Sequence, residues 1–425
     1  MQFNLFRKVF GGGSEFKKNV LTLTGGMAIA QAIPVLCSPI LSRLFSPEEF
    51  GVFANFVAIA AFVNVVIAGK YELAIILPER DHESINVLAL GCFLALISSI
   101  ILCFIFLAFG GEITHWLNVG TLSVFYWLIP ISALLSTIYL IFNEWCIRKK
   151  WFAVLGKNKI SNTAGISGVS IVFGLLKNGA GLIWGQILGQ VISSSLAICR
   201  VLKSDKHLFA YVSINKMKYF AKKYSNFAKY IIPGQLMNTV AGQMPVFLLS
   251  SHFGIYEVGL FALTDRVLGT PLTFLGNAFK DVFKQRAAQD YKIKGNCIDI
   301  YKKTSLTLLG IVIIPFALLF IIAPTLFAFV FGDEWYTAGE YVRYLSVMYM
   351  ISFVSMPTSW MFVIAEKQKL DMVWQILFLF FTVAALVIGI VLGSVKATLI
   401  SFCIGRSVVY FIQIYFTYKI AAGRI

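Results

Sequence analysis

Charged residues are scarce in this sequence. Asp, Glu, Lys and Arg make up 13% of its 425 residues, whereas a soluble domain carries about 25%. The mean hydropathy is +0.80, and apolar runs of about 20 residues, the length that a helix needs to cross a bilayer, recur along the chain. The composition excludes a soluble enzyme and predicts an all-α integral membrane protein.

The apolar runs predict about twelve transmembrane helices. They lie at residues 20–41, 50–69, 85–109, 122–142, 160–176, 181–201, 229–250, 258–279, 305–331, 342–364, 371–392 and 397–418. The longest polar stretch separates the helices into two groups of six. We therefore expect an N-terminal six-helix bundle at 1–201, a basic cytoplasmic connector at 202–228 and a C-terminal six-helix bundle at 229–425.

Acidic residues are fewer than basic ones, 20 against 36, so the net charge is +16. If the N-terminus lies inside, 30 Lys and Arg residues fall in cytoplasmic segments and only 4 in outer loops. This asymmetry follows the positive-inside rule and predicts that both termini are cytoplasmic. The surplus charge then lies beside membrane lipids, and we expect no nucleic-acid partner.

Residue patterns that support catalysis are also missing. The four histidines are isolated from any Cys or carboxylate at metal-ligand spacing, and no Gly-rich phosphate loop occurs. The seven cysteines all fall in predicted helices or cytoplasmic loops, so no structural disulfide is expected. The outer loops are too short to hold a catalytic site. We predict a protein that is not an enzyme and has no metal and no cofactor.

The two halves of the chain resemble each other at one junction. Residues 41–54 and 249–262 are identical at seven of fourteen positions at a constant offset. Each stretch joins the first helix of its half to the second. Both copies start on the same side of the membrane, so the repeat is parallel and its pseudo-two-fold axis runs along the membrane normal.

Prolines interrupt the first helix of each half. Pro34 and Pro39 lie in the first predicted helix, and Pro233 and Pro245 lie in the seventh. Proline removes a backbone donor and bends a helix, and interrupted helices at matching positions of two repeats indicate a transport site. Prolines are also common in ordinary membrane helices, so a gating kink and simple packing both remain open.

Charges inside predicted helices are the strongest functional candidates, because a charge in the bilayer is costly. Asp265 and Arg266 lie in the eighth predicted helix and Arg406 in the twelfth. A guanidinium group binds phosphate through two parallel hydrogen bonds. We predict that both arginines line a cavity and bind an anion. The alternative is a structural pair in which Asp265 holds Arg406 or another helix.

Other polar residues extend this predicted cavity. The candidates for substrate binding are Gln31, Arg43, Asn55, Asn64, Lys70, Gln235 and Asn238. Each amide taken alone is better explained by hydrogen bonding between helices. For Arg43 and Lys70, a solvated loop charge is the alternative that remains open. The concentration of these candidates in and beside the proline-containing helices is what favours a cavity.

Several stretches resemble a known family. They are KKNV at 17–20, LFSPEEFG at 44–51, YELAIILP at 71–78, FGIYEVGLFA at 253–262, FGDEW at 331–335 and Ala338-Gly339. In order and spacing they resemble the oligosaccharide flippases of the MOP superfamily, specifically the exporters of O-antigen repeat units. The resemblance spans residues 17–418.

The resemblance implies two six-helix bundles around a central cavity that opens alternately to the two faces of the membrane. It implies an undecaprenyl-diphosphate-linked oligosaccharide, an O-antigen unit or a similar surface polysaccharide unit, as the substrate. The substrate would cross from the cytoplasmic to the periplasmic leaflet of a bacterial inner membrane, within lipopolysaccharide biosynthesis. Arg266 and Arg406 are the candidates for the diphosphate and Asp265 for ion coupling. A polysaccharide polymerase and a chain-length regulator are further candidate partners.

Two other functions compete with this one. A cation-coupled multidrug exporter of the related MATE family shares the helix number and the two-lobed shape. Such an exporter needs acidic residues in its cavity, whereas this chain has arginines there as well. A membrane-embedded polysaccharide polymerase or ligase would need a larger outer loop than the sequence provides.

Overall fold

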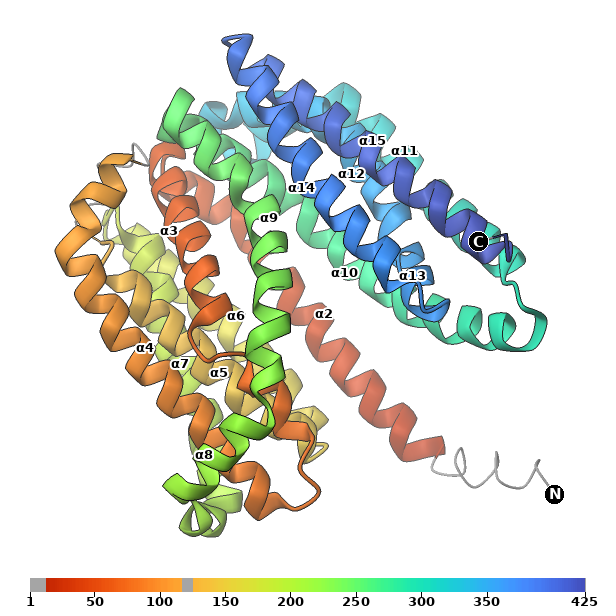
Figure 1. Ribbon diagram of the computed structural model, residues 1–425. Helices are drawn as coiled ribbons and strands as arrows, with labels where there is room; N and C mark the ends of the chain where they lie inside the picture. The colour runs from red at the N-terminus through yellow and green to blue at the C-terminus, as the bar shows by residue number, and fades with distance from the viewer. Residues whose placement is uncertain (1–12, 117–124, 425) are drawn as a thin grey trace. The chain divides into compact units, whose positions relative to one another are not determined.

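The structure is a computed structural model. It describes the backbone of residues 13–116 and 125–424, and the side chains of residues 25–112 and 125–424. Regular structure in these residues is helical throughout (Figure 1). The prediction of an all-α membrane fold is confirmed.

Long helices account for every predicted span. In the first half they are α2 (Gly13–Leu44), α3 (Pro47–Val66), α4 (Asp81–Trp116), α5 (Leu128–Arg148), α6 (Phe152–Leu175) and α7 (Gly181–Asp205), with η1 (Tyr71–Ile76) after α3. The connector contains η3 (Lys206–Tyr211), α8 (Ile214–Lys223) and η4 (Phe227–Ile231). The second half has α9 (Ile232–Phe253), α10 (Ile255–Lys294), α11 (Ile298–Phe331), η5 (Asp333–Trp335), α12 (Tyr336–Thr358), α13 (Met361–Ile364), α14 (Gln368–Val391) and α15 (Val395–Ala421).

Ten helical segments among the described residues are long and apolar enough to cross a membrane. The predicted spans 160–176 and 229–250 are not among them. They correspond to α6 and α9, which have 24 and 22 residues. At a rise of about 1.5 Å per residue both are long enough to span the hydrocarbon core. What sets them apart is the number of polar side chains that they carry.

The chain divides into two compact units according to the contacts between its residues. Unit 1 contains the chain up to Cys37, Ile59–Gly110 and the stretch that ends at Pro233. Unit 2 contains Ser38–Ala58 and the chain from Gly234 onward. This division differs from the predicted one at the end of the first helix and the start of the second. Ser38–Ala58 belongs to the predicted N-terminal bundle but packs with unit 2. The connector 202–228 packs with unit 1.

Glycines allow two helices of unit 1 to pack closely. A Cβ added to Gly189 of α7 would lie 2.5 Å from the backbone nitrogen of Ile166 in α6, and one added to Gly185 would lie 2.9 Å from the Cα of Ser170. Real Cβ atoms do not approach backbone so closely. Small residues are the usual means of close approach between membrane helices, where no hydrophobic force drives association.

The internal repeat appears in unit 2 as a reciprocal contact. A Cβ added to Gly51 of α3 would overlap the carbonyl oxygen of Ile255, and one added to Gly259 of α10 would overlap the carbonyl oxygen of Pro47. The repeat aligns Gly51 with Gly259 and Pro47 with Ile255. The two contacts are therefore equivalent, as contacts across a two-fold axis must be. This geometry agrees with the predicted parallel repeat.

A buried tryptophan joins two of the stretches that carry the family resemblance. The Trp335 ring is 1% exposed and packs edge-on against Phe50, with centroids 5.0 Å apart. Its Nε1 donates to the carbonyl oxygen of Ser42 at 2.9 Å, and the Ser42 hydroxyl donates to the carbonyl oxygen of Phe331 at 3.0 Å. These contacts hold residues 44–51 and 331–335 together within unit 2.

Candidate functional site

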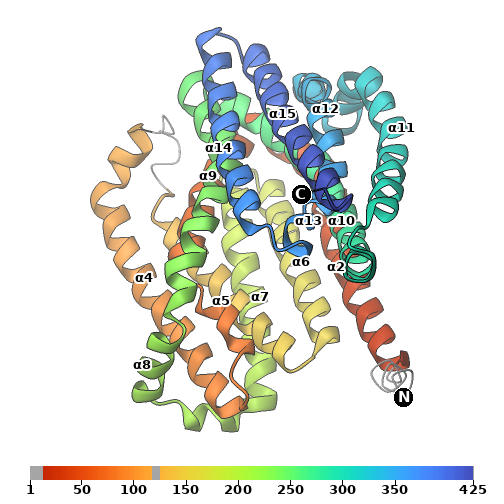
Figure 2. The same cartoon turned by 45° about the vertical axis from the view of Figure 1, so that its right-hand side comes forward.

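Arg406 anchors a polar site on unit 2, where α9, α14 and α15 lie side by side (Figures 1 and 2). Its Nη2 donates to the carbonyl oxygen of Ala241 at 2.8 Å, and its Nε donates to the Thr382 hydroxyl at 3.3 Å. The guanidinium carbon lies 4.7 Å from the ring centroids of both Phe378 and Phe402. Hydrogen bonds and ring contacts therefore hold the guanidinium group in one orientation.

Pro245 explains why Ala241 can accept this bond. A proline inside a helix has no N–H for the carbonyl four residues earlier, and that carbonyl in α9 belongs to Ala241. Ala241 is 1% exposed, so without Arg406 the free carbonyl would lack a partner in an apolar interior. The predicted kink proline and the predicted cavity arginine thus belong to one contact.

Asp265 lies on the neighbouring helix α10. The buried hydroxyl of Tyr349, from α12, donates to its Oδ1, while Asp265 itself is exposed. Asp265 and Arg406 both interact electrostatically with Tyr349 and with Tyr410 of α15. Asp265 and Arg406 form no ion pair in the part of the chain that the structure describes. Of the structural alternative, the pairing with Arg406 is therefore wrong, whereas Asp265 does bind another helix, α12, through Tyr349.

Asn238 extends the same face along α9 and α14. Its Nδ2 donates to Oε1 of Gln375 at 3.4 Å, and Gln375 in turn donates to Oδ2 of Asp371 at 2.9 Å. Gln235, one turn before Asn238, is exposed. We call the polar group made of Ala241, Asp265, Tyr349, Thr382, Arg406 and Tyr410 the unit 2 site; Asn238 and Gln235 lie further along α9.

The other predicted residues of unit 2 have separate surroundings. The Arg266 guanidinium carbon lies 5.9 Å from the ring centroid of Phe50. The buried Asn55 donates to the carbonyl oxygen of Gly51 at 3.1 Å and to the Ser250 hydroxyl at 3.3 Å, which fits an interhelical hydrogen bond.

Arg43 and Pro39 lie at the end of α2. Nη2 of Arg43 donates to the carbonyl oxygen of Phe329 at 2.9 Å. The carbonyl oxygen of Pro39 accepts from the Ser42 hydroxyl at 3.1 Å. Arg43 thus caps carbonyls near the end of α11, where the C-terminal turn of a helix leaves them without helical partners.

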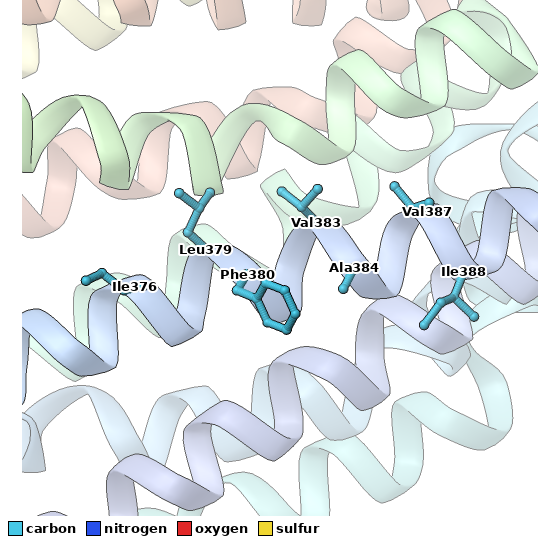
Figure 3. A pocket seen from close by; sticks show the side chains of 7 residues that line it. All are labelled: Ile376, Leu379, Phe380, Val383, Ala384, Val387 and Ile388. Atoms are coloured by element: carbon cyan, nitrogen blue, oxygen red, sulfur yellow. The ribbon is translucent and has the colours of Figure 1, made fainter.

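One hollow on unit 2 is apolar, and its lining residues all belong to α14. It has a volume of about 550 Å³, and its lining residues are Ile376, Leu379, Phe380, Val383, Ala384, Val387 and Ile388 (Figure 3). These positions recur every three or four residues, as expected for one face of a helix. The hollow offers no hydrogen-bonding side chain, so it is suited to hydrocarbon and not to a saccharide.

Unit 1 holds the remaining predicted residues. Lys70 is 8% exposed, has a φ of 62° and pairs with Glu72 of η1 at 3.5 Å. Asn64 accepts a bond from the Thr137 hydroxyl at 3.4 Å, which is an interhelical contact. Gln31 is exposed.

The two remaining prolines of the prediction differ in exposure. Pro34 is half-buried in α2, and Pro233 is exposed near the start of α9.

Glu72 is a buried acid that sequence reasoning did not assign to a site. It is 6% exposed, and its Oε2 has no hydrogen-bond partner among the described residues. Tyr349 was also missed, because a tyrosine in a hydrophobic helix gives no signal of its role. A left-handed backbone at a non-glycine residue, as at Lys70, is a further mark of constraint that only the structure reveals.

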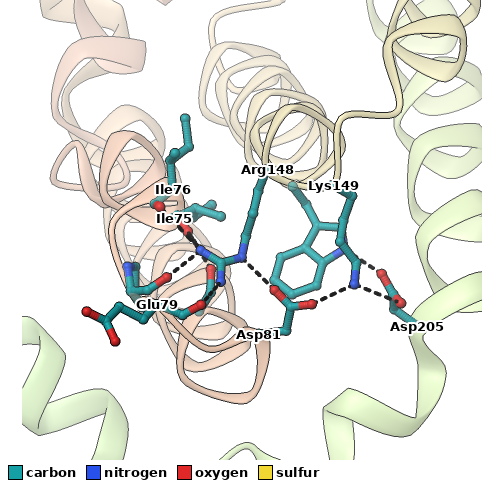
Figure 4. A network of polar contacts seen from close by, with 10 residues as sticks. Ile75, Ile76, Glu79, Asp81, Arg148, Lys149 and Asp205 are labelled. Carbon is teal, nitrogen blue, oxygen red and sulfur yellow. Dashed lines mark hydrogen bonds and ion pairs between the residues drawn. The ribbon is translucent and has the colours of Figure 1, made fainter. Parts of the chain in front are cut away.

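Charged residues form a network of hydrogen bonds and ion pairs at the end of η1 in unit 1. The Arg148 Nη1 at the end of α5 donates to the carbonyl oxygens of Ile75, Ile76 and Pro78 at 3.3, 3.2 and 2.6 Å (Figure 4). Its Nε pairs with Asp81 at 2.9 Å. Arg148 thereby satisfies carbonyls that the short helix leaves open.

Lys149 continues this network. It pairs with Asp81 at 2.7 Å and with Asp205 at 3.4 Å, and Asp205 also accepts from Trp145 Nε1 at 2.9 Å (Figure 4). Burial alone would lower the pKa of Lys149, but the hydrogen bond to Asp81 and the charge of Asp205 together raise this pKa above its ordinary value. Lys149 is therefore a structural cation.

Metal-ligating residues do not gather in the described part of the chain. Among the side chains of residues 25–112 and 125–424, no group of three or more His, Cys, Asp or Glu is placed to hold a metal ion. The charges of the unit 2 site instead contact aromatic rings, hydroxyls and a backbone carbonyl.

Comparison with protein families decides the kind of protein that carries this site. The model of a family described as polysaccharide biosynthesis protein matches residues 40–340, more than half of the chain. The chain belongs to this family. A search among curated proteins found no significant match.

Solved structures of the same fold are transporters and a flippase. An inward-facing multidrug resistance MATE family transporter of the MOP superfamily is 17% identical, with a TM-score of 0.71, over 94% of this chain and 98% of that one. The lipid II flippase MurJ, in an inward closed conformation, is 10% identical, with a TM-score of 0.74, over 94% of this chain and 90% of that one. The predicted MOP-type fold is confirmed.

Proposed function

We propose that this member of the polysaccharide biosynthesis family moves an undecaprenyl-diphosphate-linked oligosaccharide across a bacterial inner membrane, from the cytoplasmic to the periplasmic leaflet. The observation that carries the proposal is the anchored Arg406. Of the five N–H donors of its guanidinium, the described residues use one on Nε and one on Nη2. The donors on Nη1 and one on Nη2 remain for an anion such as a diphosphate.

The surroundings of Arg406 suit the rest of this substrate. Trp374, Phe378 and Tyr410 form a chain of rings beside it, with centroids 5.2 and 5.7 Å apart. Aromatic rings pack on the apolar faces of sugars, and Asn238 and Gln375 offer amides for sugar hydroxyls. Arg406 would bind the diphosphate, with Arg266 as a second cation of unit 2. Export in this direction would supply a polysaccharide polymerase and its chain-length regulator.

Asp265 is the residue that we assign to ion coupling. Its carboxylate is exposed, it accepts a bond from Tyr349, and it lies on the face where Arg406 would bind the substrate. A carboxylate that gains and loses a proton or binds a monovalent cation would change the charge next to the diphosphate. The hydrogen bond from Tyr349 holds this carboxylate in place in both states.

A second candidate function is the cation-coupled export of organic cations. It is favoured by the exposed Asp265 and by the fold shared with MATE transporters. The presence of Arg406 in the same site argues against it, because a fixed positive charge repels a cationic drug. Drug-efflux assays on the same variants separate the two functions.

The test is the sidedness of lipid-linked oligosaccharide in cells that lack the gene. We expect complete repeat units to accumulate on the inner leaflet and wild-type protein to correct this. Arg406→Ala is expected to fail, whereas Arg286→Ala, an exposed arginine of α10, is expected to succeed at equal membrane abundance. If the units reach the outer face normally in the deletion strain, the proposal is wrong.

A further inference from the structure

The connector of unit 1, together with Lys229 and Tyr230 that follow it, carries a basic surface with no exposed acid. Between residues 203 and 230 every lysine is exposed: Lys203, Lys206, Lys216, Lys218, Lys222, Lys223 and Lys229. The single acidic residue of this stretch, Asp205, is buried and bound to Trp145 and Lys149. The positive charge of the surface is therefore not neutralised within the stretch.

Large apolar and aromatic side chains are exposed among these lysines. Ile214, Tyr219 and Tyr230 are 70%, 60% and 75% exposed, and Tyr211 is 53% exposed. Exposed isoleucine and tyrosine among lysines are typical of a helix that lies in a membrane interface. There the rings sit at the headgroup level and the lysine stems extend to the phosphates.

The opposite face of α8 is fixed to unit 1. Phe220 is 4% exposed and packs, with Met217 and Ala221, in the core that contains Tyr71. The Tyr71 hydroxyl donates to the carbonyl oxygen of Ala221 at 2.8 Å. The helix is thus held against the protein by one face, and its lysines and exposed aromatic residues face outward.

The surface also lies at the ends of membrane-spanning helices. The span that contains α7 runs to Tyr211, and Asn86 near the start of α4 donates to the carbonyl oxygen of Tyr211 at 3.2 Å and accepts from the Ser213 amide at 2.9 Å. In Figure 1, α8 lies at the same end of unit 1 as these helix termini. This end of the spans is where lipid headgroups lie.

We propose that this connector surface, made of the seven lysines with Tyr211, Ile214, Tyr219 and Tyr230, binds the headgroups of anionic phospholipids. The occupant follows from charge complementarity, since the anionic cytoplasmic leaflet attracts basic segments next to a span. The exposed aliphatic and aromatic side chains select a lipid surface over a soluble acidic partner. The proposal does not depend on the transported substrate.

The experiment counts lipids retained by the purified full chain in native mass spectrometry, after mixing with equal amounts of phosphatidylglycerol and phosphatidylcholine. The variant is Lys216→Gln with Lys218→Gln, Lys222→Gln and Lys223→Gln. Its control removes the same charge from exposed lysines of unit 2, Lys292, Lys294, Lys302 and Lys303. Each lysine near an anionic surface contributes about fivefold to binding, so removing four should lower phosphatidylglycerol affinity by roughly six hundredfold.

We expect the connector variant to lose the preference for phosphatidylglycerol and the control to keep it. Ile214→Ser with Tyr219→Ser should weaken binding while its salt dependence stays that of the wild type, because these residues bind through burial and not through charge. If the lysine variant keeps the wild-type preference, or if the control loses as much, the proposal is overturned. Size-exclusion profiles and melting temperatures without added lipid confirm that each variant is folded.

Discussion

Units 1 and 2 bury polar groups in different ways. In unit 1, Gln190 of α7 accepts from Ser132 at 2.9 Å and donates to Ser136 at 2.6 Å, so neutral groups join α5 and α7. In unit 2, the groups that form hydrogen bonds between helices include charged ones. Arg406 donates to Ala241 and Thr382, and Asp265 accepts from Tyr349. The charges of unit 1 that form ion pairs lie near helix ends, as Lys149 does.

This difference helps to distinguish polar groups that only hold helices together from charged groups that packing alone does not explain. A neutral hydrogen bond between membrane helices contributes about 0.6 to 1.7 kcal/mol, which is enough to hold them together. A charge in the middle of a membrane helix costs about 2.5 kcal/mol or more. The contacts of Arg406 and Asp265 are thus an expensive means of packing, and the transport role proposed above would account for that cost.

The largest effect is expected from Arg406→Met. The loss of charge-assisted hydrogen bonds to a diphosphate, at about 1.5 to 3 kcal/mol each, should lower transport by about a hundredfold. The measurement is the rate at which lipid-linked oligosaccharide reaches the outer leaflet. Arg406→Lys, which keeps the charge but not the fork of donors, should retain partial activity. If a folded Arg406→Met protein transports at the wild-type rate, the charge of Arg406 has no role in transport, and the proposed functional difference between the two units is wrong.

The next effect is expected at the glycine contact of unit 2. Gly259→Ala and Gly51→Ala each place a methyl group on a backbone carbonyl oxygen, so each should destabilise the protein by about 3 kcal/mol, seen as a lower melting temperature. Gly310→Ala in α11, where nothing lies within 4 Å of the added Cβ, is the matched control and should not lower the melting temperature. If all three variants melt alike, the reciprocal contact does not hold α3 and α10 together.

A smaller effect is expected from Gln190→Leu in unit 1. The change leaves the hydroxyls of Ser132 and Ser136 without their partner and should lower stability by about 1 to 2 kcal/mol. Transport should stay near that of the wild type when equal amounts of folded protein are compared. A large loss of transport at unchanged melting temperature would show that unit 1 also uses its buried polar groups for function.

The smallest effect concerns the pH dependence of Lys149. Its pKa is raised in the folded chain, so its contribution is complete below the unfolded value of about 10.4 and is lost as pH rises through the folded value. Because Asp81 is 40% exposed, the pair contributes about 0.5 kcal/mol. Lys149→Gln should therefore lower the melting temperature at pH 8, and this difference from the wild type should shrink as pH rises through the folded pKa of Lys149. Lys157→Gln, an exposed lysine of α6, should have no effect over the same pH range.

Much of the fold could be predicted from the sequence, because the bilayer imposes a length and a polarity on each segment. A helix must stay apolar over about 20 residues to cross the membrane, so the spans are visible as local runs. The repeat was visible for a related reason: close backbone approach permits only glycine at residues 51 and 259, and the match persisted in both halves. Arg406, Asp265 and Pro245 could be selected because charges and prolines in such helices are rare.

The partners of these residues depended on contacts between positions far apart in the chain. Arg406 meets the carbonyl of Ala241, 165 residues earlier, and Tyr349 meets Asp265, 84 residues earlier. No local pattern marks such pairs, because an apolar run is compatible with many rotations and neighbours of its helix. For the same reason the packing of Ser38–Ala58 with unit 2 was not predicted. Local polarity places a helix in the membrane, whereas only side-chain packing between helices decides which polar groups meet.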